Sequence, residues 1–182
     1  MKPASPPPSI IFTTPRLYAR PLTPADAPAM HLVYGDAAAM RWVGDGQTLS
    51  LAQCEQWVEV TERNYATRGY GMFALLCRAS GAVIGFCGLV HPGGQPEAEM
   101  KYALQRQFWG QGLASEAAAA MLASAAALFG LQHVIATVAP DNPASQKVLL
   151  KAGMQRGPLR RNQDGSDTQL FAWQAPASAN AR

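Results

Sequence analysis

The pattern of hydrophobic and polar positions along this 182-residue chain changes period several times, and each change predicts a helix or a strand. Three helices are expected in the first third of the chain, because residues that favour N-caps precede apolar positions spaced three or four apart. The third is the clearest, since it begins behind Ser50, carries Cys54, Trp57 and Val58 at helical spacing, and ends at Gly69. The three predicted helices span residues 24–34, 37–42 and 51–68.

Short runs of apolar and β-branched residues, bounded by turn residues, predict the strands. Two consecutive runs flank residues 78–82, whose composition is typical of a hairpin turn, and a second turn is expected at residues 163–166. The predicted strands span residues 10–12, 17–20, 71–77, 83–90, 97–105, 133–139, 154–161 and 168–173.

Two further helices are predicted between the later strands. Residues 113–129 are rich in alanine, which has the highest helix propensity, and this helix should end at Gly130. The second helix should begin after Asn142, with Pro143 at its first position, and end before Gly153. The order of elements predicts a mixed α/β domain in which helices cover a sheet.

Length and composition are those of one soluble domain, with 48% hydrophobic and 15% charged residues. The net charge of +3 is too small to indicate a nucleic-acid partner. Residues 1–9 are rich in proline and lack the apolar core of a signal peptide, and no run is long enough to span a membrane. We therefore expect no membrane partner, a domain at residues 10–174, and disordered tails at residues 1–9 and 175–182.

The cysteines and histidines predict neither a disulfide framework nor a metal site. Cys54, Cys77 and Cys87 are odd in number and show no CxxC spacing, and the histidines are scattered. A reducing, cytoplasmic location is the default for such a chain. Cys77 and Cys87 lie in apolar strand-like runs and are expected to be core thiols.

The stretch from Gln107 to Ser115 carries the strongest functional signal. Gly110 and Gly112 stand where a strand turns into a helix, and glycine permits positive φ and close approach of a ligand. The unpaired N–H groups and the dipole of the helix favour a phosphate there. The spacing excludes a P-loop, which needs Lys and Ser or Thr after the second glycine, and a dinucleotide fingerprint, because position 115 is serine. For these six positions alone, a glycine-rich helix entry without a ligand is the simpler interpretation.

Three motifs in order along the chain resemble the GNAT superfamily of acetyltransferases. The motif Gln107-x-x-Gly110-x-Gly112 is similar to the loop that binds the pyrophosphate of acetyl-CoA in that family. The closest resemblance is to the branch of ribosomal-protein N-terminal (alanine/serine) acetyltransferases and spermidine acetyltransferases, and it covers residues 10–174. The motifs are TPRL…RPL…DA from Thr14, FWGQGLASEA from Phe108, and NPASQKVLLKAGM from Asn142.

The resemblance implies the GNAT fold: a central, mostly antiparallel, twisted sheet flanked by helices, with a splayed strand pair that holds coenzyme A. It implies acetyl-CoA as co-substrate and no metal. Backbone groups on the strand before the loop would bond the pantetheine arm, and loop N–H groups would hold the pyrophosphate. The implied cofactor-binding residues are Tyr102, Ala103, Leu104, Gln107, Gly110, Gln111, Gly112, Leu113, Ala114, Ser115 and Asn142.

The activity implied by the resemblance is transfer of an acetyl group from acetyl-CoA to a primary amine, by direct attack in a ternary complex. A protein or peptide N-terminal α-amine is the first choice of acceptor, and a polyamine or an aminoglycoside is the alternative. A non-catalytic acyl-CoA sensor and a purely structural α/β domain remain further alternatives. The protein is expected to be a monomer or a homodimer.

Glu99 is the candidate general base, because the family often has a glutamate at this position on the strand entering the loop. A solvated glutamate on a strand is the alternative interpretation. The chain departs from the family pattern Glu-x-Gly-Tyr at Lys101, which strand alternation places on the same face as Glu99. A neighbouring ammonium would make Glu99 a poorer base, unless Lys101 pairs with Glu97 instead.

Ser145 is the candidate proton donor to the departing thiolate. Many relatives place a tyrosine four residues later, where this chain has Leu149, and in the ribosomal-protein branch a serine occupies the position of Ser145. An ordinary serine in the first turn of a helix is the alternative. Glu116 is expected to stabilise the helix N-terminus through the dipole, and Phe108 and Trp109 to pack in the core.

The acceptor is expected to contact the first two helices, the loop near residues 65–70 and the turn at residues 158–167. These are the regions in which members of the family differ in substrate. The predicted acceptor-binding residues are Trp42, Tyr70, Arg160 and Arg161.

Overall fold

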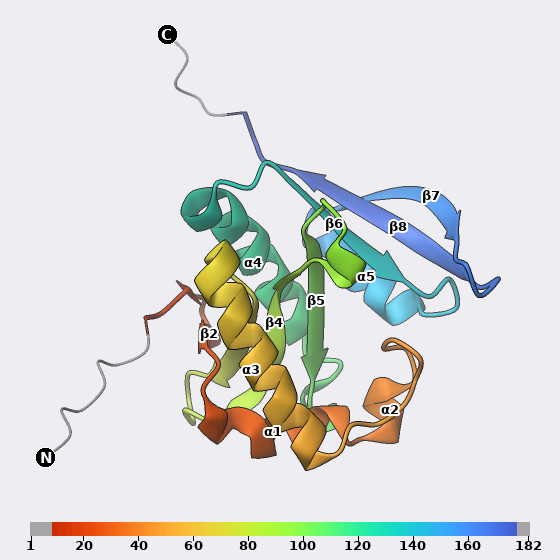
Figure 1. Ribbon diagram of the computed structural model, residues 1–182. Helices are drawn as coiled ribbons and strands as arrows, with labels where there is room; N and C mark the ends of the chain where they lie inside the picture. The colour runs from red at the N-terminus through yellow and green to blue at the C-terminus, as the bar shows by residue number, and fades with distance from the viewer. Residues whose placement is uncertain (1–8, 178–182) are drawn as a thin grey trace, which may run out of the picture.

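The structure, a computed structural model, describes residues 9–177 and contains one eight-stranded sheet (Figure 1). The spatial order is β1-β2-β3-β4-β5-β6-β8-β7, and every neighbouring pair is antiparallel except β5 and β6. The predicted tails lie mostly outside the described residues. The strands are β1 (Phe12–Thr13), β2 (Leu17–Pro21), β3 (Met72–Cys77), β4 (Val83–Val90), β5 (Glu99–Leu104), β6 (His133–Val138), β7 (Gln155–Arg161) and β8 (Asp167–Gln174).

The helices begin where the predicted N-caps stand. The Ser50 hydroxyl accepts a hydrogen bond from the N–H of Gln53 at 3.2 Å, and the Asp36 carboxylate accepts one from Ala38 at 2.9 Å. Gly69 and Gly130 end their helices in the left-handed region, as expected for C-terminal glycines. The helices are η1 (Pro24–Asp26), α1 (Ala27–Tyr34), α2 (Ala37–Met40), α3 (Leu51–Arg68), η2 (Pro92–Gly94), η3 (Arg106–Phe108), α4 (Leu113–Phe129) and α5 (Pro143–Lys151).

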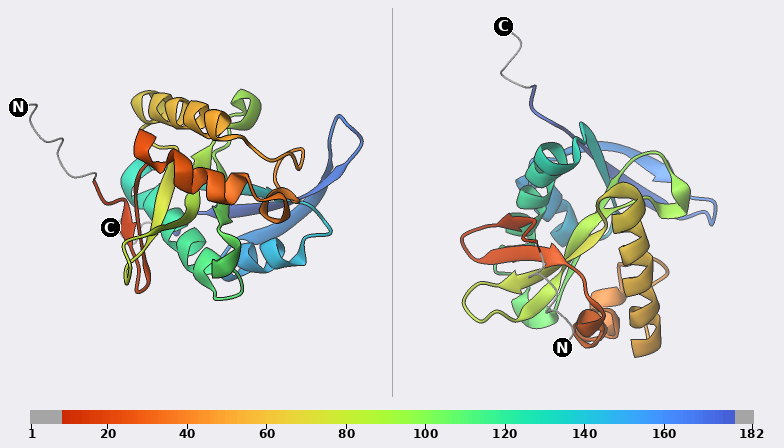
Figure 2. Two further views of the ribbon diagram at one scale, coloured as in Figure 1. Left: turned by 90° about the horizontal axis from the view of Figure 1, so that it is seen from below. Right: turned by 60° about the vertical axis from the view of Figure 1, so that its left-hand side comes forward.

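Two apolar layers form because helices cover both faces of the sheet (Figure 2). Helices α1 and α3 bury Val33 and Val58 against one face, and α4 buries Met121 and Leu122 against the other. The apolar stripe of α3 is narrower than its sequence spacing predicts, because Trp57 is 48% exposed. Within residues 9–177, no helix is both long enough and apolar enough to cross a membrane.

Strands β5 and β6 separate almost as soon as they meet. Their parallel ladder consists of the single pair Glu99 and Ile135, whereas β5 and β4 are paired from Glu99 to Leu104. The backbone of residues 102–104 therefore has no strand partner on the β6 side, and this break in the ladder between β5 and β6 is called the opening below. This is the predicted splayed strand pair.

The cysteines follow the predicted pattern only in part. Cys87 on β4 is fully buried, as is Cys54 on α3, while Cys77 at the end of β3 is half-buried. Burial raises the pKa of the Cys87 thiol to about 12, so this thiol stays protonated at neutral pH. Cys77 was expected in the core, but its strand ends at the surface, in the hairpin turn.

Candidate active site

The glycine-rich loop enters α4 with its backbone N–H groups free of side-chain caps. Gly110 and Gly112 have φ of 71° and 77°, in the region that side chains other than glycine rarely adopt. Gly112 is the N-cap of α4 and has no side chain to accept hydrogen bonds from the first turn. The N–H groups of residues 113–115 are therefore placed to receive an anion.

Side chains of the loop hold its shape and leave the backbone for a ligand. The indole N–H of Trp109 donates to the carbonyl of Leu104 at 2.9 Å, and the Gln111 amide donates to the carbonyl of Gln107 at 3.0 Å. Phe108 packs against the core as predicted. The expectation for Trp109 was wrong, because its ring is 45% exposed and only its N–H is tied back to the strand.

Glu116 ties the loop to the N-terminal hairpin. Its carboxylate accepts hydrogen bonds from the Thr14 hydroxyl at 2.6 Å, the Arg16 N–H at 2.9 Å and the Arg16 Nε at 2.7 Å. Arg16 Nη1 also donates to the carbonyl of Gln111 at 2.8 Å. Partial burial by itself would raise the pKa of Glu116, but these hydrogen bonds together hold the pKa below its usual range. The sequence analysis did not predict that Glu116 contacts Thr14 and Arg16. Both ends of this contact nevertheless lie in motifs that carry the family resemblance, TPRL and FWGQGLASEA.

Glu99 is buried beneath three hydrogen-bond donors. Its side chain is 2% exposed, and the Gln95 amide donates to Oε2 at 3.2 Å. The Thr137 hydroxyl and the Lys101 ammonium both donate to Oε1. Of the two partners considered for Lys101, the structure selects Glu99 and leaves Glu97 exposed. Sequence reasoning missed Gln95 and Thr137, which carry no motif.

Tyr102 and Ser145 form a hydroxyl pair on the other side of the sheet. The Tyr102 hydroxyl lies 2.6 Å from Ser145 Oγ and 3.2 Å from the Ser145 carbonyl oxygen. Burial raises the pKa of Tyr102 to about 12, against the opposing effect of the Ser145 hydrogen bond. Asn142 caps α5 by accepting the Ser145 N–H at 3.2 Å. The tyrosine that the family carries four residues later is replaced here by the fully buried Leu149.

The opening between β5 and β6 connects these two groups. Because side chains alternate along a strand, Glu99 and Lys101 face the side covered by α1–α3, whereas Tyr102 faces α4 and α5. A molecule bound along the unpaired edge of β5 would lie near groups from both faces. The site therefore offers a carboxylate and an ammonium on one face and a pair of hydroxyls on the other.

The four predicted acceptor-binding residues lie in different environments. Trp42 is 40% exposed, with the guanidinium of Arg41 4.8 Å from its ring centroid. Arg160 and Arg161 are exposed on β7, and Arg161 pairs with Asp167 at 3.2 Å. Tyr70, by contrast, is buried.

Tyr70 belongs to the interior of the fold. Its hydroxyl lies 2.8 Å from Nε2 of His91, and its ring centroid lies 5.2 Å from that of Phe129. His91 Nδ1 lies 2.9 Å from the carbonyl oxygen of Gln95, so Nδ1 carries the proton in the neutral ring and the Tyr70 hydroxyl donates to Nε2. Tyr70 thus helps to hold His91 and the segment that carries Gln95, whose amide donates a hydrogen bond to Glu99.

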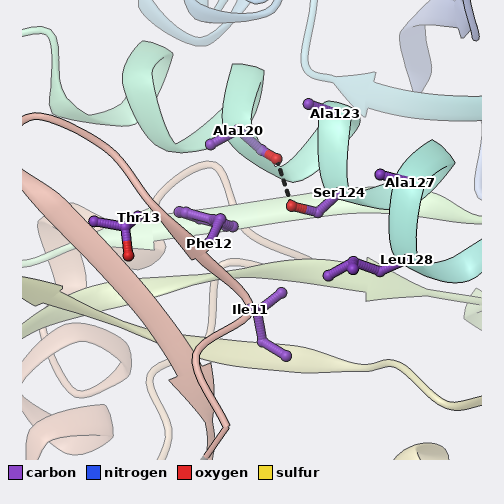
Figure 3. A pocket seen from close by; sticks show the side chains of 8 residues that line it. All are labelled: Ile11, Phe12, Thr13, Ala120, Ala123, Ser124, Ala127 and Leu128. Atoms are coloured by element: carbon purple, nitrogen blue, oxygen red, sulfur yellow. Dashed lines mark hydrogen bonds between the residues drawn. The ribbon is translucent and has the colours of Figure 1, made fainter.

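A hollow in the described part of the chain lies away from this site. It has a volume of about 420 Å³ and lies between β1 and α4 (Figure 3). Its lining includes Ile11, Leu128 and Ser124, and the Ser124 hydroxyl is bonded to the carbonyl of Ala120 at 2.9 Å. No charged side chain and no histidine or cysteine lines it, so it offers no general base. Residues 9–177 likewise contain no cluster of three or more His, Cys, Asp or Glu able to hold a metal ion.

Comparison with known proteins agrees with the geometry. Residues 16–155 match the family model described as the acetyltransferase (GNAT) domain. The N-acetyltransferase YoaA of Bacillus subtilis (strain 168), itself uncharacterised, is 28% identical over 169 residues, which is 89% of this chain and 95% of that protein.

Two solved structures illustrate the similarity of fold. An acetyltransferase from Agrobacterium tumefaciens str. C58 superposes with a TM-score of 0.75 at 27% identity, covering 94% of this chain and 96% of that one. The ribosomal L7/L12 α-N-protein acetyltransferase RimL, in complex with coenzyme A, superposes with a TM-score of 0.77 at 22% identity, covering 91% and 98%.

Proposed function

The chain belongs to the GNAT family of acetyltransferases, and from that premise we propose that it acetylates the N-terminal α-amine of a protein or peptide. It is an acetyl-CoA-dependent N-acetyltransferase; the acceptor class is the proposal. The observation that carries the proposal is the arrangement of Glu99 and the Tyr102–Ser145 pair, on opposite faces of the opening between β5 and β6.

The residues present suit acetyl-CoA along the whole opening. The N–H groups from Gly110 through Ser115 would hold the pyrophosphate, because α4 begins without a side-chain cap. The backbone of Tyr102, Ala103 and Leu104 would bond the pantetheine arm like an added strand, since the ladder to β6 has already ended there. The thioester carried by acetyl-CoA would then lie between Glu99 and Ser145.

Direct attack by the acceptor amine suits this site better than an acyl-enzyme. Cys87 is fully buried on β4, the strand beside β5, and its raised pKa keeps it a thiol, which is a poor nucleophile. Glu99 would receive the proton that the acceptor must lose, directly or through a water molecule. The Lys101 ammonium must yield its contact with Glu99 when the acceptor arrives.

The hydroxyl pair would protonate the leaving thiolate. Tyr102 has one proton, and when it donates that proton to Ser145 Oγ, the hydroxyl proton of Ser145 is free to point into the opening. The high pKa of Tyr102 keeps the phenol protonated at neutral pH. Ser145 would therefore be the immediate donor, with Tyr102 behind it.

Protonation energetics favour an α-amine as acceptor. At pH 7, neutralising an α-amine of pKa about 8 costs roughly 1 kcal/mol, whereas a lysine-type amine of pKa about 10.4 costs roughly 4.6 kcal/mol. A carboxylate already bonded to Lys101 is better matched to the smaller task. The Lys101 charge would also repel a polycation such as spermidine. The acidic side chains that could attract a polycation, Glu55, Glu59 and Glu62, lie exposed on α3, where contact with solvent accounts for them.

The structural likeness to RimL supports only the fold at 22% identity, so the acceptor needs its own test. We would measure thiol release from acetyl-CoA with peptides that begin with serine, alanine or threonine, with the same peptides blocked at the N-terminus, and with spermidine and an aminoglycoside. Release with free but not with blocked peptides is expected. Release with only the small amines would establish the small-molecule alternative, and acetyl-CoA binding with no release from any acceptor would favour the sensor.

A further inference from the structure

Lys101 is a primary amine that lies at the opening where an acceptor amine has to arrive. Its Nζ contacts Oε1 of Glu99, the candidate base, and lies 3.4 Å from Thr137 Oγ1 on β6. The side chain thus reaches across the gap between β5 and β6 on the face of α1–α3. It is 42% exposed, while Glu99 beneath it is 2% exposed, so Lys101 is the accessible member of the pair.

From this placement we propose that Lys101 is itself an acetyl acceptor, and that the protein acetylates this residue in the absence of another amine. The proposal rests on the function proposed above, because it needs an acetyl thioester in the opening. Neutralising a lysine amine costs more than neutralising an α-amine, so this reaction should be slower than acetylation of an acceptor peptide. A lysine amine with an adjacent base is still a nucleophile. Lys101 combines the amine with the base candidate, two residues apart on one strand face.

The reaction balances with groups already in the site. The ammonium of Lys101 gives a proton to the Glu99 carboxylate, and the neutral Nζ attacks the carbonyl carbon of the thioester. The new N–C bond forms as the C–S bond breaks. The thiolate takes a proton from Ser145, which recovers one from the attacking nitrogen by way of solvent, and Glu99 releases its proton to solvent. The products are N-acetyl-lysine, coenzyme A as thiol, and one proton.

Acetylation of Lys101 would change the base that it contacts. An acetylated Nζ is a neutral amide and no longer forms an ion pair, so Glu99 would keep only the neutral donors Gln95 and Thr137. An external acceptor and Lys101 would also compete for the same carboxylate. A good acceptor peptide should therefore suppress acetylation of Lys101.

Two other lysines of the chain supply internal controls. Lys147 and Lys151 are exposed on α5 and form none of the ion pairs found among the described residues. Their acetylation measures the slow reaction of acetyl-CoA with any surface amine.

The test is to incubate the full-length protein with acetyl-CoA and no acceptor, then to map acetyl-lysine by peptide mass spectrometry over time. Acetylation of Lys101 should exceed that of Lys147 and Lys151 by tenfold or more, at a rate independent of protein concentration. It should fall at least tenfold in Glu99→Gln, and Lys101→Arg should lose it while binding acetyl-CoA as before. Acetylation of Lys101 no faster than at Lys147 and Lys151 would overturn the proposal, as would a rate that rises with protein concentration.

Calorimetry with acetyl-CoA and thiol release with peptides, on the same preparation, separate the two proposals. A protein that acetylates peptides but leaves Lys101 unmodified contradicts the self-acetylation proposal alone. A protein that does not bind acetyl-CoA contradicts the proposed function as well.

Discussion

The loop from Gln107 to Ser115 and the cluster around Glu99 belong to one site but are built differently. The loop would act through backbone N–H groups, and its side chains turn back to fix its shape, as Trp109 does on Leu104. The cluster would act through side chains that come from separate strands and a helix. The difference shows that donor binding can be encoded locally, whereas acid–base chemistry depends on contacts across the fold.

The largest effect expected from breaking the cluster follows Glu99→Gln. This change keeps the shape of the side chain but removes the proton acceptor, so kcat should fall about 100-fold or more. The Kd of acetyl-CoA should change less than twofold, because the loop is untouched. Steady-state kinetics and calorimetry measure the two quantities. Glu97→Gln, at an exposed neighbour, is the matched control, and an equal loss of kcat there would contradict the assignment.

A change in the loop should weaken the binding of acetyl-CoA, whereas a change in the cluster should lower kcat. Gly112→Val forces a β-branched side chain into φ of 77° at the proposed pyrophosphate site, and should raise the Kd of acetyl-CoA about tenfold or more, or about 1.4 kcal/mol. Gly130→Val is the control, because Gly130 has φ of 66° at the far end of the same helix, with nothing within 4 Å of an added Cβ. Equal losses of affinity in both variants would mean that strain, and not ligand contact, explains the effect.

The hydroxyl pair should give a smaller loss, and one that is not additive. Tyr102→Phe and Ser145→Ala are each expected to lower kcat about tenfold, because each removes one member of the proposed proton donor. The double variant should be little worse than the worse single one, since the two groups act as a unit. A double variant whose loss equals the product of the single losses would show that the hydroxyls act independently.

The smallest effect concerns the link between the loop and the N-terminal hairpin. Glu116→Gln should lower the free energy of unfolding by about 1 kcal/mol at pH 7, because it weakens charged hydrogen bonds to Arg16 that are partly exposed to solvent.

The pH dependence of this stabilisation gives a second test. The pKa of Glu116 is lowered in the folded state, so its stabilisation is present above the ordinary value of 4.5 and is lost as the pH falls through the folded value. Denaturant titrations of wild type and variant should therefore converge below about pH 4.5. Glu59→Gln, on the exposed side of α3, is the control and should show no such convergence.

The same contrast explains how much could be predicted from the sequence. Helix ends at Ser50, Gly130 and Asn142 follow from local capping chemistry, and the glycine pair places the loop. The contact of Tyr102 with Ser145 spans 43 residues of sequence, and that of Thr137 with Glu99 spans 38. Neither pair has a local signature, so the sequence could propose the individual residues but not the networks that join them.

Tyr70 illustrates the same limit from the other direction. Its position after α3 predicts an acceptor contact by resemblance, yet the fold buries it beside His91 and Phe129. Burial depends on what packs against a residue, and here the partners come from segments 21 and more positions away. Trp57 was misplaced for the same reason, since helical spacing indicates a face but not how wide a surface the sheet will cover.

Hydrogen–deuterium exchange with and without coenzyme A tests most directly where the donor binds. The account predicts slower exchange at the amides of residues 102–104 and 110–115 when coenzyme A is added. The hollow between β1 and α4 and the β7–β8 hairpin should exchange at unchanged rates. Protection at residues 11–13 and 120–128, with the loop unchanged, would contradict the assignment of the opening between β5 and β6 as the acetyl-CoA site.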